Sequence, residues 1–581
     1  MRFMEQNKGQ TFMHGALILI LSNVLVKVIG ALFKIPLARL LNEEGMAIFN
    51  TAYQVYAALF AISTTGLPIA ISKMVAENMA QKNVEMCRRI FKVSFLLLGA
   101  LGLTGSLVLY FFAPYIASMI RDTAATYSMI AISPALFFIC IASCYRGFFQ
   151  GMLNMKPTAI SQVIEALGKL MLGYGLAFVL MRYARISAAE SQKELIYDWP
   201  AAGAVLGITL GIIVSAFYLA IKYLSFVRKR GYAALDDGRQ KNVLSSLTIT
   251  KNLILIAVPI TLGAFVSSIT AIVDMVMIRG RLQDIAFTKE TAQQLYNLCH
   301  IAIYDRNHVF SDFLQTLSLG EKQARWLYGS YSGYAYPLFN LPSTIVLALS
   351  MSIVPAISAA LASNDRLRAQ NTVQSVVRII LVFSLPCSVM LIMCAEPMLR
   401  LLYHNISSAM LLKLMAPACV AITLVSVTTA VLQASGHVMI PVRNMVMGGI
   451  IKVISNYFLI GSAHFGIFGA PISTSICYFF IAICNLMAVK KTLEVSFDFT
   501  QSVVRPLIAS MLMGACLWIF GKFGFWQEGT SNLVTIGLIG INGIFYIIFL
   551  LFVKGLVKKD IEMLPNGKNI VKVLAKYKII D

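Results

Sequence analysis

Apolar runs of membrane-spanning length recur along the chain and constrain its fold more than any other feature. A helix of about 20 apolar residues crosses the hydrocarbon core of a bilayer, where every backbone polar group must be satisfied within the protein. We expect fourteen such helices, with approximate limits 13–33, 48–72, 93–113, 127–145, 157–181, 201–221, 252–278, 333–361, 379–395, 409–432, 444–460, 466–489, 506–521 and 531–553. The sequence therefore predicts an all-α membrane protein.

Composition agrees with a membrane location and argues against an enzyme. Of 581 residues, 58% are hydrophobic and 13% are charged, whereas soluble domains are about 25% charged. The ten cysteines are scattered without a C-x-x-C pair, so we expect neither a metal site nor a disulfide framework. The sequence contains no Walker A, H-E-x-x-H or G-x-S-x-G motif. We therefore expect no catalytic residues and no cofactor.

The basic charge is distributed as a membrane topology requires. The formal net charge is +22, and the excess of Lys and Arg falls at both ends of the chain and in alternate loops. Lys and Arg are enriched in the cytoplasmic loops of membrane proteins. We therefore expect both termini in the cytoplasm, with a basic tail at 554–581 resting on anionic lipid head groups. The division of the charge among many short loops argues against a nucleic-acid partner.

The chain contains an internal repeat. Four residue pairs recur at one constant offset with similar neighbours: Pro114 and Pro397, Pro134 and Pro417, Gln150 and Gln433, and Lys169 and Lys452. A smaller offset pairs Lys34 with Asp274 and Arg39 with Arg279, which implies an insertion near 282–328 in the second copy. Six spans separate the copies, so both begin on the same side of the membrane and the repeat is parallel.

The repeat predicts the domain organisation. We expect two six-helix lobes, at 1–230 and 252–490, joined by a basic cytoplasmic linker at 231–251. The insertion near 282–328 then belongs to an outer loop of the second lobe, and helices 13 and 14, at 491–553, fall outside the repeat. Two lobes around a path through the membrane are typical of transporters.

Cationic side chains mark the first span. Lys27 and Lys34 share a helix face, and Arg39 continues the basic character towards the outer end. An ionisable residue inside a membrane is costly unless it is paired or hydrated. Two interpretations are open: Lys34 extends along the span to the interface, or this face lines a wet lumen that binds an anionic cargo such as a phosphate.

Further charged residues lie within other spans. Glu165 and Lys169 lie one turn apart in the favourable order. They form either a self-neutralising pair or a site at which Lys169 exchanges Glu165 for a phosphate. Asp274 lies on the seventh span of the chain and Lys452 on the eleventh, and both spans belong to the second lobe. They form either an interhelical salt bridge or part of an ion site.

Two segments outside the repeated spans also allow alternatives. The last span carries Gly537, Gly540 and Gly543. Small residues at this spacing favour close helix packing, and the alternative is a shallow groove that admits an acyl chain. The insertion near 282–328 contains aromatic residues and balanced charge, which suggests a small outer cap, with His300 and His308 as surface residues.

Two stretches resemble a known family. "YRGFFQGMLNMKPTAISQVIEALGK" at 145–169 and "GLPIAISKMVAENMAQ" at 66–81 are similar to the stage V sporulation protein B group. This group contains Gram-positive relatives of the MurJ lipid II flippases, within the multidrug/oligosaccharidyl-lipid/polysaccharide exporter superfamily. The likeness extends over nearly the whole chain.

The resemblance implies an alternating-access flippase in the bacterial plasma membrane. Its cargo would be an undecaprenyl-pyrophosphate-linked cell-wall precursor, with lipid II as the first candidate and peptidoglycan synthesis and cell shape as the process served. Membrane lipids and other cell-wall synthesis proteins would be its partners. The resemblance also implies a cationic cavity for the pyrophosphate, matched here by Lys27, Lys34 and Arg39, and a groove along the last two helices for the lipid tail.

One position departs from the family pattern. Some relatives bind sodium in the second lobe, and Asp274 and Asn456 match such a site. Lys452 stands one turn before Asn456, where a neutral or acidic ligand is expected, and this argues against sodium.

Three other functions have specific requirements. A drug/cation antiporter of the same superfamily needs an acidic lumen, whereas Lys27 and Lys34 make this one basic. A membrane-embedded glycosyltransferase needs a carboxylate base in an outer loop near a metal or phosphate site, and no such cluster is evident in the sequence. A flippase for another lipid-linked polysaccharide has the same requirements as a lipid II flippase.

Overall fold

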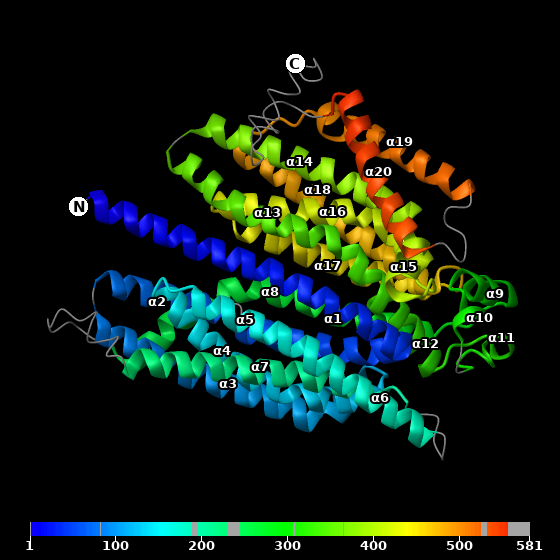
Figure 1. The fold of residues 1–581 in the computed structure, drawn as a ribbon, viewed down its shortest axis with the longest axis horizontal. Helices are drawn as coiled ribbons and strands as arrows, with labels where there is room; N and C mark the ends of the chain where they lie inside the picture. Colours follow the sequence, from blue (N-terminus) through cyan, green and yellow to red (C-terminus); the bar gives the residue numbers. More distant parts are fainter. Residues whose placement is uncertain are drawn as a thin grey trace. The chain divides into compact units, whose positions relative to one another are not determined.

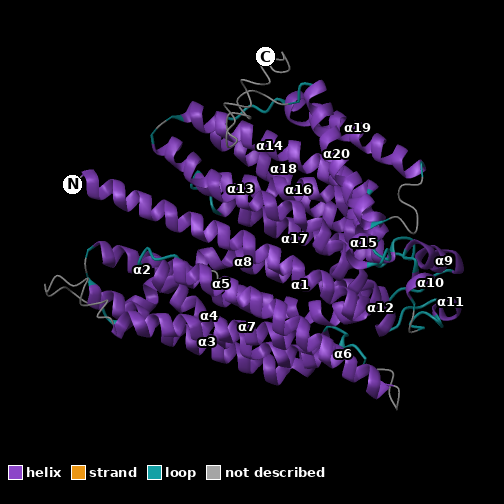
Figure 2. Ribbon diagram, viewed as in Figure 1, coloured by secondary structure: helices purple, strands orange, loops and turns teal. Residues whose placement is uncertain are grey.

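The computed structural model describes residues 2–64, 66–81, 83–188, 196–228, 244–305, 308–363, 365–523 and 531–555. Nearly all of these residues are helical (Figure 2). The expected basic linker at 231–251 is described only from residue 244, and the expected basic tail at 554–581 only to Gly555. The predicted all-α fold is confirmed.

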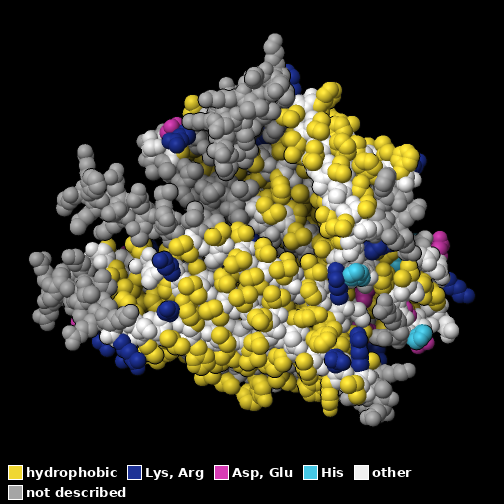
Figure 3. All heavy atoms as spheres, in the orientation of Figure 1, with side chains coloured by type: hydrophobic (Ala, Val, Ile, Leu, Met, Phe, Trp, Pro, Cys, Tyr) yellow, Lys and Arg dark blue, Asp and Glu magenta, His cyan; other side chains and the backbone are white. Residues whose placement is uncertain are grey.

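Each of the fourteen expected spans overlaps a helix of the structure. Nine helical stretches among the described residues are long and apolar enough to cross a membrane, and the chain is therefore a multi-pass membrane protein. Exposed apolar side chains cover the helices that Figure 3 presents, as lipid contact requires. That all fourteen expected helices cross the membrane stays a prediction.

The chain forms two compact units, Met1–Gly280 and Arg281–Asp581. Their boundary lies beyond the linker expected at 231–251, so the seventh expected span groups with the first unit by its contacts. The two six-helix lobes stay a prediction from the repeat.

The helices of unit 1 are α1 (Arg2–Thr64), α2 (Gly66–Ala80), α3 (Val84–Met119), α4 (Thr126–Gly151), α5 (Lys156–Gly168), η2 (Lys169–Gly173), α6 (Tyr174–Ala188), α7 (Asp198–Arg228) and α8 (Ser246–Gln283), with a short η1 (Thr123–Ala125) (Figure 1).

The first expected span and most of the second lie in α1, which is kinked at Asn42. This residue has φ 53° and ψ −168°, a left-handed φ that Asn tolerates better than most residues. Its side-chain amide donates a hydrogen bond to the Tyr197 hydroxyl at 2.9 Å. The second expected span, at 48–72, overlaps α1 up to Thr64 and α2 from Gly66.

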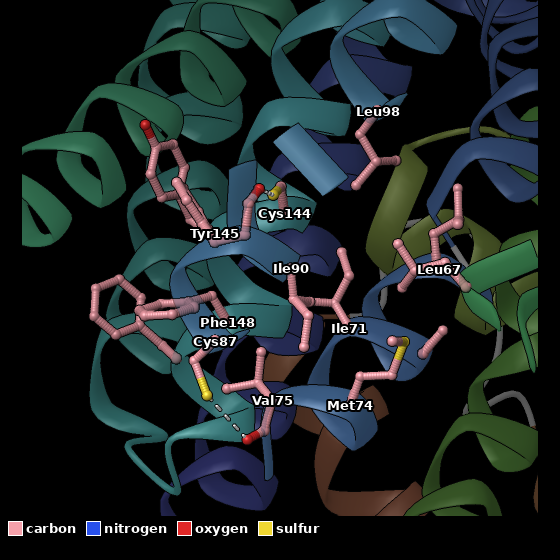
Figure 4. Close-up of a cluster of buried hydrophobic side chains, with 14 of the residues drawn as sticks. Leu67, Ile71, Met74, Val75, Cys87, Ile90, Leu98, Cys144, Tyr145 and Phe148 are labelled. Atoms are coloured by element: carbon pink, nitrogen blue, oxygen red, sulfur yellow. Dashed lines mark hydrogen bonds between the residues drawn. The ribbon is translucent and has the colours of Figure 1, made fainter. Parts of the chain in front are cut away.

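A buried apolar cluster joins α2, α3, α4, α7 and α8 at one end of unit 1 (Figure 4). Ile71 and Val75 on α2 pack with Ile90 on α3 and Phe148 on α4. The α8 helix contributes Ile249, Leu253 and Ala257, which recur every four residues and so share one face. This stripe is the physical reason why α8 belongs to unit 1.

Glycines on α7 allow α5, η2 and α6 to approach closely. Gly203, Gly207 and Gly211 recur every fourth residue, the small-x-x-x-small spacing that brings membrane helices together. A Cβ at Gly207 would collide with Gly173, and one at Gly211 would lie 3.0 Å from the Glu165 carbonyl oxygen. The backbone that carries Glu165 and Lys169 is therefore held against α7.

Unit 2 contains the remaining helices. They are α9 (Lys289–Leu298), α10 (Ile301–Tyr304), α11 (Phe313–Thr316), α12 (Glu321–Gly329), η4 (Ser330–Ala335), α13 (Tyr336–Ala362), α14 (Arg366–Met393), α15 (Ala395–Tyr403), α16 (Ala409–Ala434), α17 (Met439–Ile460), η5 (Gly466–Phe468), α18 (Gly469–Leu493), η6 (Thr500–Val504), α19 (Arg505–Lys522) and α20 (Asn532–Phe552). The α16 helix packs against α13, α14 and α18, and α19 packs against α14 and α20.

The insertion near 282–328 is a folded cap. It contains α9 to α12 around a small aromatic core, in which Phe310 contacts Phe313 and Trp326 edge to face. The Tyr304 hydroxyl accepts a hydrogen bond from the Ile406 amide at 3.1 Å, which ties the cap to the turn before α16. The eighth expected span is continuous with this cap, because α12, η4 and α13 follow one another directly.

Close packing does not occur at the three glycines of α20. A Cβ at Gly537, Gly540 or Gly543 would meet no atom within 4 Å, and all three residues are exposed. The helix instead packs through Thr535, Leu538, Asn542, Tyr546 and Leu550. Among the residues that the structure describes, none covers the glycine face of α20, so the close packing that the spacing favours is not found there.

We expect a cysteine in the cap to be accessible from outside the cell. Gln315 is exposed on α11, so Gln315→Cys in intact cells should react with a membrane-impermeant maleimide. The native Cys299 thiol should not compete, because burial raises its pKa to about 12. Lys251→Cys, exposed at the beginning of α8, is the matched control and should react only after the membrane is permeabilised. Labelling of Lys251→Cys but not of Gln315→Cys in intact cells would show that the cap faces the cytoplasm.

Candidate functional site

Charged side chains converge within unit 1 where α4, α5 and η2 face one another. Glu165 accepts a hydrogen bond from the Lys169 ammonium at its Oε1, 2.8 Å away, and one from the Arg146 guanidinium at its Oε2, 3.0 Å away. The Glu165–Lys169 pair predicted from the spacing is therefore formed. We call Arg146, Glu165 and Lys169 the charged cluster.

Sequence analysis missed Arg146. The predicted fourth span ends at residue 145 and leaves Arg146 in the following loop, but α4 continues to Gly151. Its Nε donates to the Ser161 hydroxyl at 3.0 Å, and its Nη2 donates to the Ser215 hydroxyl at 3.1 Å. Ser215 in turn donates to the Ser161 carbonyl at 2.9 Å. Arg146 therefore links α4 to α5 and α7 through hydrogen bonds that do not involve Lys169.

The members of the cluster differ in exposure. The side chains of Arg146 and Glu165 are 13% and 14% exposed, and that of Lys169 is 27% exposed. Lys169 is thus the cation that a ligand reaches most easily. Because the cluster holds two cations and one carboxylate, it carries a net positive charge within a membrane-spanning bundle.

The backbone around Lys169 is a π-helix. Residues Lys169–Gly173 form η2, inserted between α5 and α6. Single-turn π segments within α-helices occur often at functional sites. The flanking Gly168 and Gly173 lie against Gly211 and Gly207 of α7, so a larger residue at these contacts would push the bulge away from its support. The π-turn thus lies at the position of the exposed cation.

The other predicted cations lie along α1. Lys34 is half-buried on α1, the helix that packs along α5 and η2. Lys27 and Arg39 have exposed side chains. Lys27 lies about 10 Å from Lys34 along the helix, given the rise of 1.5 Å per residue. Lys34 is thus the least exposed of the three predicted cations on α1, and Lys27 and Arg39 extend the basic character along the helix.

The residues predicted for an ion site fall in different units. Asp274 is buried on α8 in unit 1, while Lys452 and Asn456 are buried on α17 in unit 2. The Ser473 hydroxyl on α18 donates a hydrogen bond to the Asn456 side-chain oxygen. The pairing of Asp274 with Lys452 stays a prediction. Among the residues that the structure describes, no three His, Cys, Asp or Glu side chains gather as metal ligands.

A second buried ion pair was not anticipated. Asp122, in the turn after α3, pairs with Arg279 in the last turns of α8, and both side chains are almost fully buried. Breaking a buried pair leaves an uncompensated charge. The pair therefore fixes the end of α8 to the α3–α4 turn, in addition to the apolar stripe at the other end of α8.

We expect Glu165→Gln to destabilise the protein more than Lys169→Met. The first change leaves Arg146 and Lys169 close together without their shared anion. It should lower the free energy of unfolding by about 2 kcal/mol, less than the roughly 3–5 kcal/mol of a fully buried pair. The second change keeps the Arg146–Glu165 pair intact. Thermal melting of the purified variants measures the difference.

A double variant provides the control for this prediction. Arg146→Met combined with Glu165→Gln removes both the buried cation and its anion, so part of the lost stability should return. Equal melting temperatures for Glu165→Gln and Lys169→Met would contradict a shared carboxylate.

Comparisons with known proteins agree with this architecture. The family "Polysaccharide biosynthesis protein" matches residues 12–361, and the family "Lipid II flippase MurJ" matches residues 241–538. Stage V sporulation protein B of Bacillus subtilis (strain 168) is 26% identical over 566 residues, which cover 96% of this chain and 98% of the relative.

Two solved structures share the fold. The lipid II flippase MurJ in an inward closed conformation has a TM-score of 0.57 at 14% identity, covering 92% of this chain and 98% of the other. An inward-facing multidrug resistance MATE family transporter of the MOP superfamily has a TM-score of 0.60 at 16% identity, covering 81% of this chain and 94% of the other. The chain therefore belongs to the polysaccharide biosynthesis protein and lipid II flippase MurJ families, a group of multi-pass membrane transporters.

Proposed function

We propose that this protein is an alternating-access flippase. Its cargo is an undecaprenyl-pyrophosphate-linked cell-wall precursor, with lipid II as the first candidate, and it moves this cargo from the cytoplasmic to the outer leaflet of the bacterial plasma membrane. The observation that carries the proposal is the charged cluster, in which Lys169 and Arg146 share one carboxylate. Lys34, half-buried on the neighbouring α1, is a further cation of unit 1. An excess of cations within a membrane-spanning bundle suits an anionic head group.

The pyrophosphate binds by exchange at Lys169. In the free protein, the Lys169 ammonium donates to Glu165 Oε1. A phosphate oxygen replaces this carboxylate as the acceptor, and Lys34 supplies a second positive charge beside it. Arg146 keeps Glu165 Oε2 and its two serine partners throughout, so Glu165 retains a cation after Lys169 leaves. The cluster thus binds a dianion without exposing an unpaired buried carboxylate.

The lipid tail lies along α20. The uncovered face of this helix carries Gly537, Gly540 and Gly543, flanked by exposed Ile536 and Ile544. Glycines among branched apolar residues leave a shallow apolar strip, which suits an acyl or prenyl chain. This assignment agrees with the groove that the resemblance implies for the last two helices.

The rival functions make different demands on the same residues. A drug/cation antiporter, as the likeness to a MATE transporter allows, needs uncompensated carboxylates, whereas Glu165 is bound to two cations. A flippase for another lipid-linked polysaccharide would use the same pyrophosphate contacts. The side of the membrane on which lipid II accumulates when the protein is depleted separates these functions.

We expect depletion to trap lipid II in the inner leaflet, and expect Lys169→Ala and Lys34→Ala to restore export poorly. A charge-assisted hydrogen bond to a phosphate contributes roughly 1.5–3 kcal/mol, so each variant should flip about tenfold more slowly or worse. Lys27→Ala should have a smaller effect, because Lys27 lies about two helical turns from Lys34 along α1. The measurement is the sidedness of labelled lipid II in cells.

The matched control is Lys92→Ala, an exposed lysine near the beginning of α3. It should restore export fully. Full export by a Lys34→Ala and Lys169→Ala double variant would reject a cationic cargo site. Unchanged lipid II sidedness after depletion would favour another cargo.

We also expect transport to proceed without sodium. Lys452 and Asn456 are buried one turn apart on α17, with exposed fractions of 8% and 1%. We propose that the Lys452 ammonium serves as a tethered cation in place of a bound ion. Flipping rate and melting temperature should respond equally to sodium and potassium chloride. A saturable increase with sodium alone would reject this role of Lys452.

A further inference from the structure

Five aromatic rings form a continuous row on α1. Phe33 contacts Phe49 edge to face at 6.1 Å between ring centroids, and Phe49 stacks on Tyr53 at 6.0 Å with an interplanar angle of 9°. Tyr53 contacts Tyr56 at 6.0 Å, and Tyr56 contacts Phe60 at 5.7 Å. The last four residues recur at spacings of three and four, which places them on one face of the helix.

The row begins at the π-turn that carries Lys169. The ring of Phe33 lies against Gly173, the last residue of η2, where a Cβ would be 3.0 Å from the ring. The α1 helix also packs along α5 and η2. Phe33 contacts Phe49, and Tyr53 stacks on Phe49, so the Tyr53 ring lies two ring contacts away from this turn. Aromatic surface and phosphate-binding charge are therefore adjacent on the same unit.

The rings differ in accessibility. Phe33, Phe49 and Tyr56 are almost fully buried, at 4%, 1% and 5%. Tyr53 and Phe60 keep part of their surface exposed. Tyr53 is thus stacked on the buried Phe49, while part of its side chain stays exposed.

Sugars bind such surfaces. The C–H bonds on one face of a pyranose are weakly positive and pack against the negative face of an aromatic ring. A phenol hydroxyl also donates and accepts hydrogen bonds, which matches the hydroxyl and amide groups around a sugar. In a lipid-linked precursor, the first sugar is joined directly to the pyrophosphate. A cation that holds the phosphate therefore places this sugar within reach of a neighbouring ring.

We propose that Tyr53 is a sugar-binding residue that contacts the pyrophosphate-linked sugar of the cargo. Phe49 holds the Tyr53 ring in place, and Lys169 positions the phosphate next to it. This inference rests on the proposed function and adds a means of selection: the protein favours a glycosylated lipid pyrophosphate over the bare lipid carrier that returns after the sugar has been used.

Two ligands separate sugar binding from phosphate binding. The purified full-length protein is titrated with undecaprenyl pyrophosphate, and separately with the same lipid carrying N-acetylmuramyl pentapeptide. Tyr53→Leu should weaken binding of the sugar-bearing ligand about fivefold, the scale of one aromatic contact, and leave the bare pyrophosphate unchanged. Tyr53→Phe, the matched control, keeps the ring and should retain most of the affinity.

The outcomes are distinguishable. Equal affinities of wild type and Tyr53→Leu for the sugar-bearing ligand would overturn the sugar contact and leave the proposed function intact. Equal weakening for both ligands would also overturn it, because the residue would then act on the pyrophosphate or on the fold. If wild type binds neither ligand, the proposed function fails and the sugar site fails with it.

Discussion

One carboxylate shared by two cations is the interaction on which the site depends. Glu165 uses a separate oxygen for Arg146 and for Lys169, so loss of one contact does not leave it alone in a medium where an uncompensated charge is costly. The two cations are unequal. Arg146 is held by two further serine hydroxyls, and Lys169 is the more exposed. The arrangement therefore has one fixed cation and one that can change its partner.

Helix packing sets the position of this carboxylate. The glycines of α7 allow α5 and η2 to lie directly on its backbone, and Gly211 contacts the Glu165 carbonyl. The π-turn that follows places Lys169 and Gly173 at its two ends, with Phe33 packed against the second. The charged cluster and the aromatic row are consequently parts of one packed region of unit 1. Within it, α5 and η2 contact α7 through their backbones at the glycines.

The local features of this region follow from the sequence, and the long-range ones do not. Spacing alone pairs Glu165 with Lys169, because residues four apart on a helix are neighbours. Arg146 escaped prediction because the apolar run of the fourth span ends at Tyr145, although the helix continues to Gly151. The Asp122–Arg279 pair joins residues far apart in the chain, and no periodicity predicts such a contact. Conversely, the spacing of Gly537, Gly540 and Gly543 predicts close packing that the described part of the chain does not provide, because small residues permit close approach without requiring it.

The central claim is that Lys169 leaves Glu165 for the pyrophosphate. The most direct test is the affinity of purified protein for undecaprenyl pyrophosphate in two variants, measured well below their melting temperatures. If Glu165 competes with the ligand, Glu165→Gln should bind as tightly as wild type or more tightly, whereas Lys169→Gln should bind more weakly by about tenfold. Weaker binding by Lys169→Gln without weaker binding by Glu165→Gln would support the exchange. Equal weakening in both variants would show that the pair acts as one unit and would contradict the account.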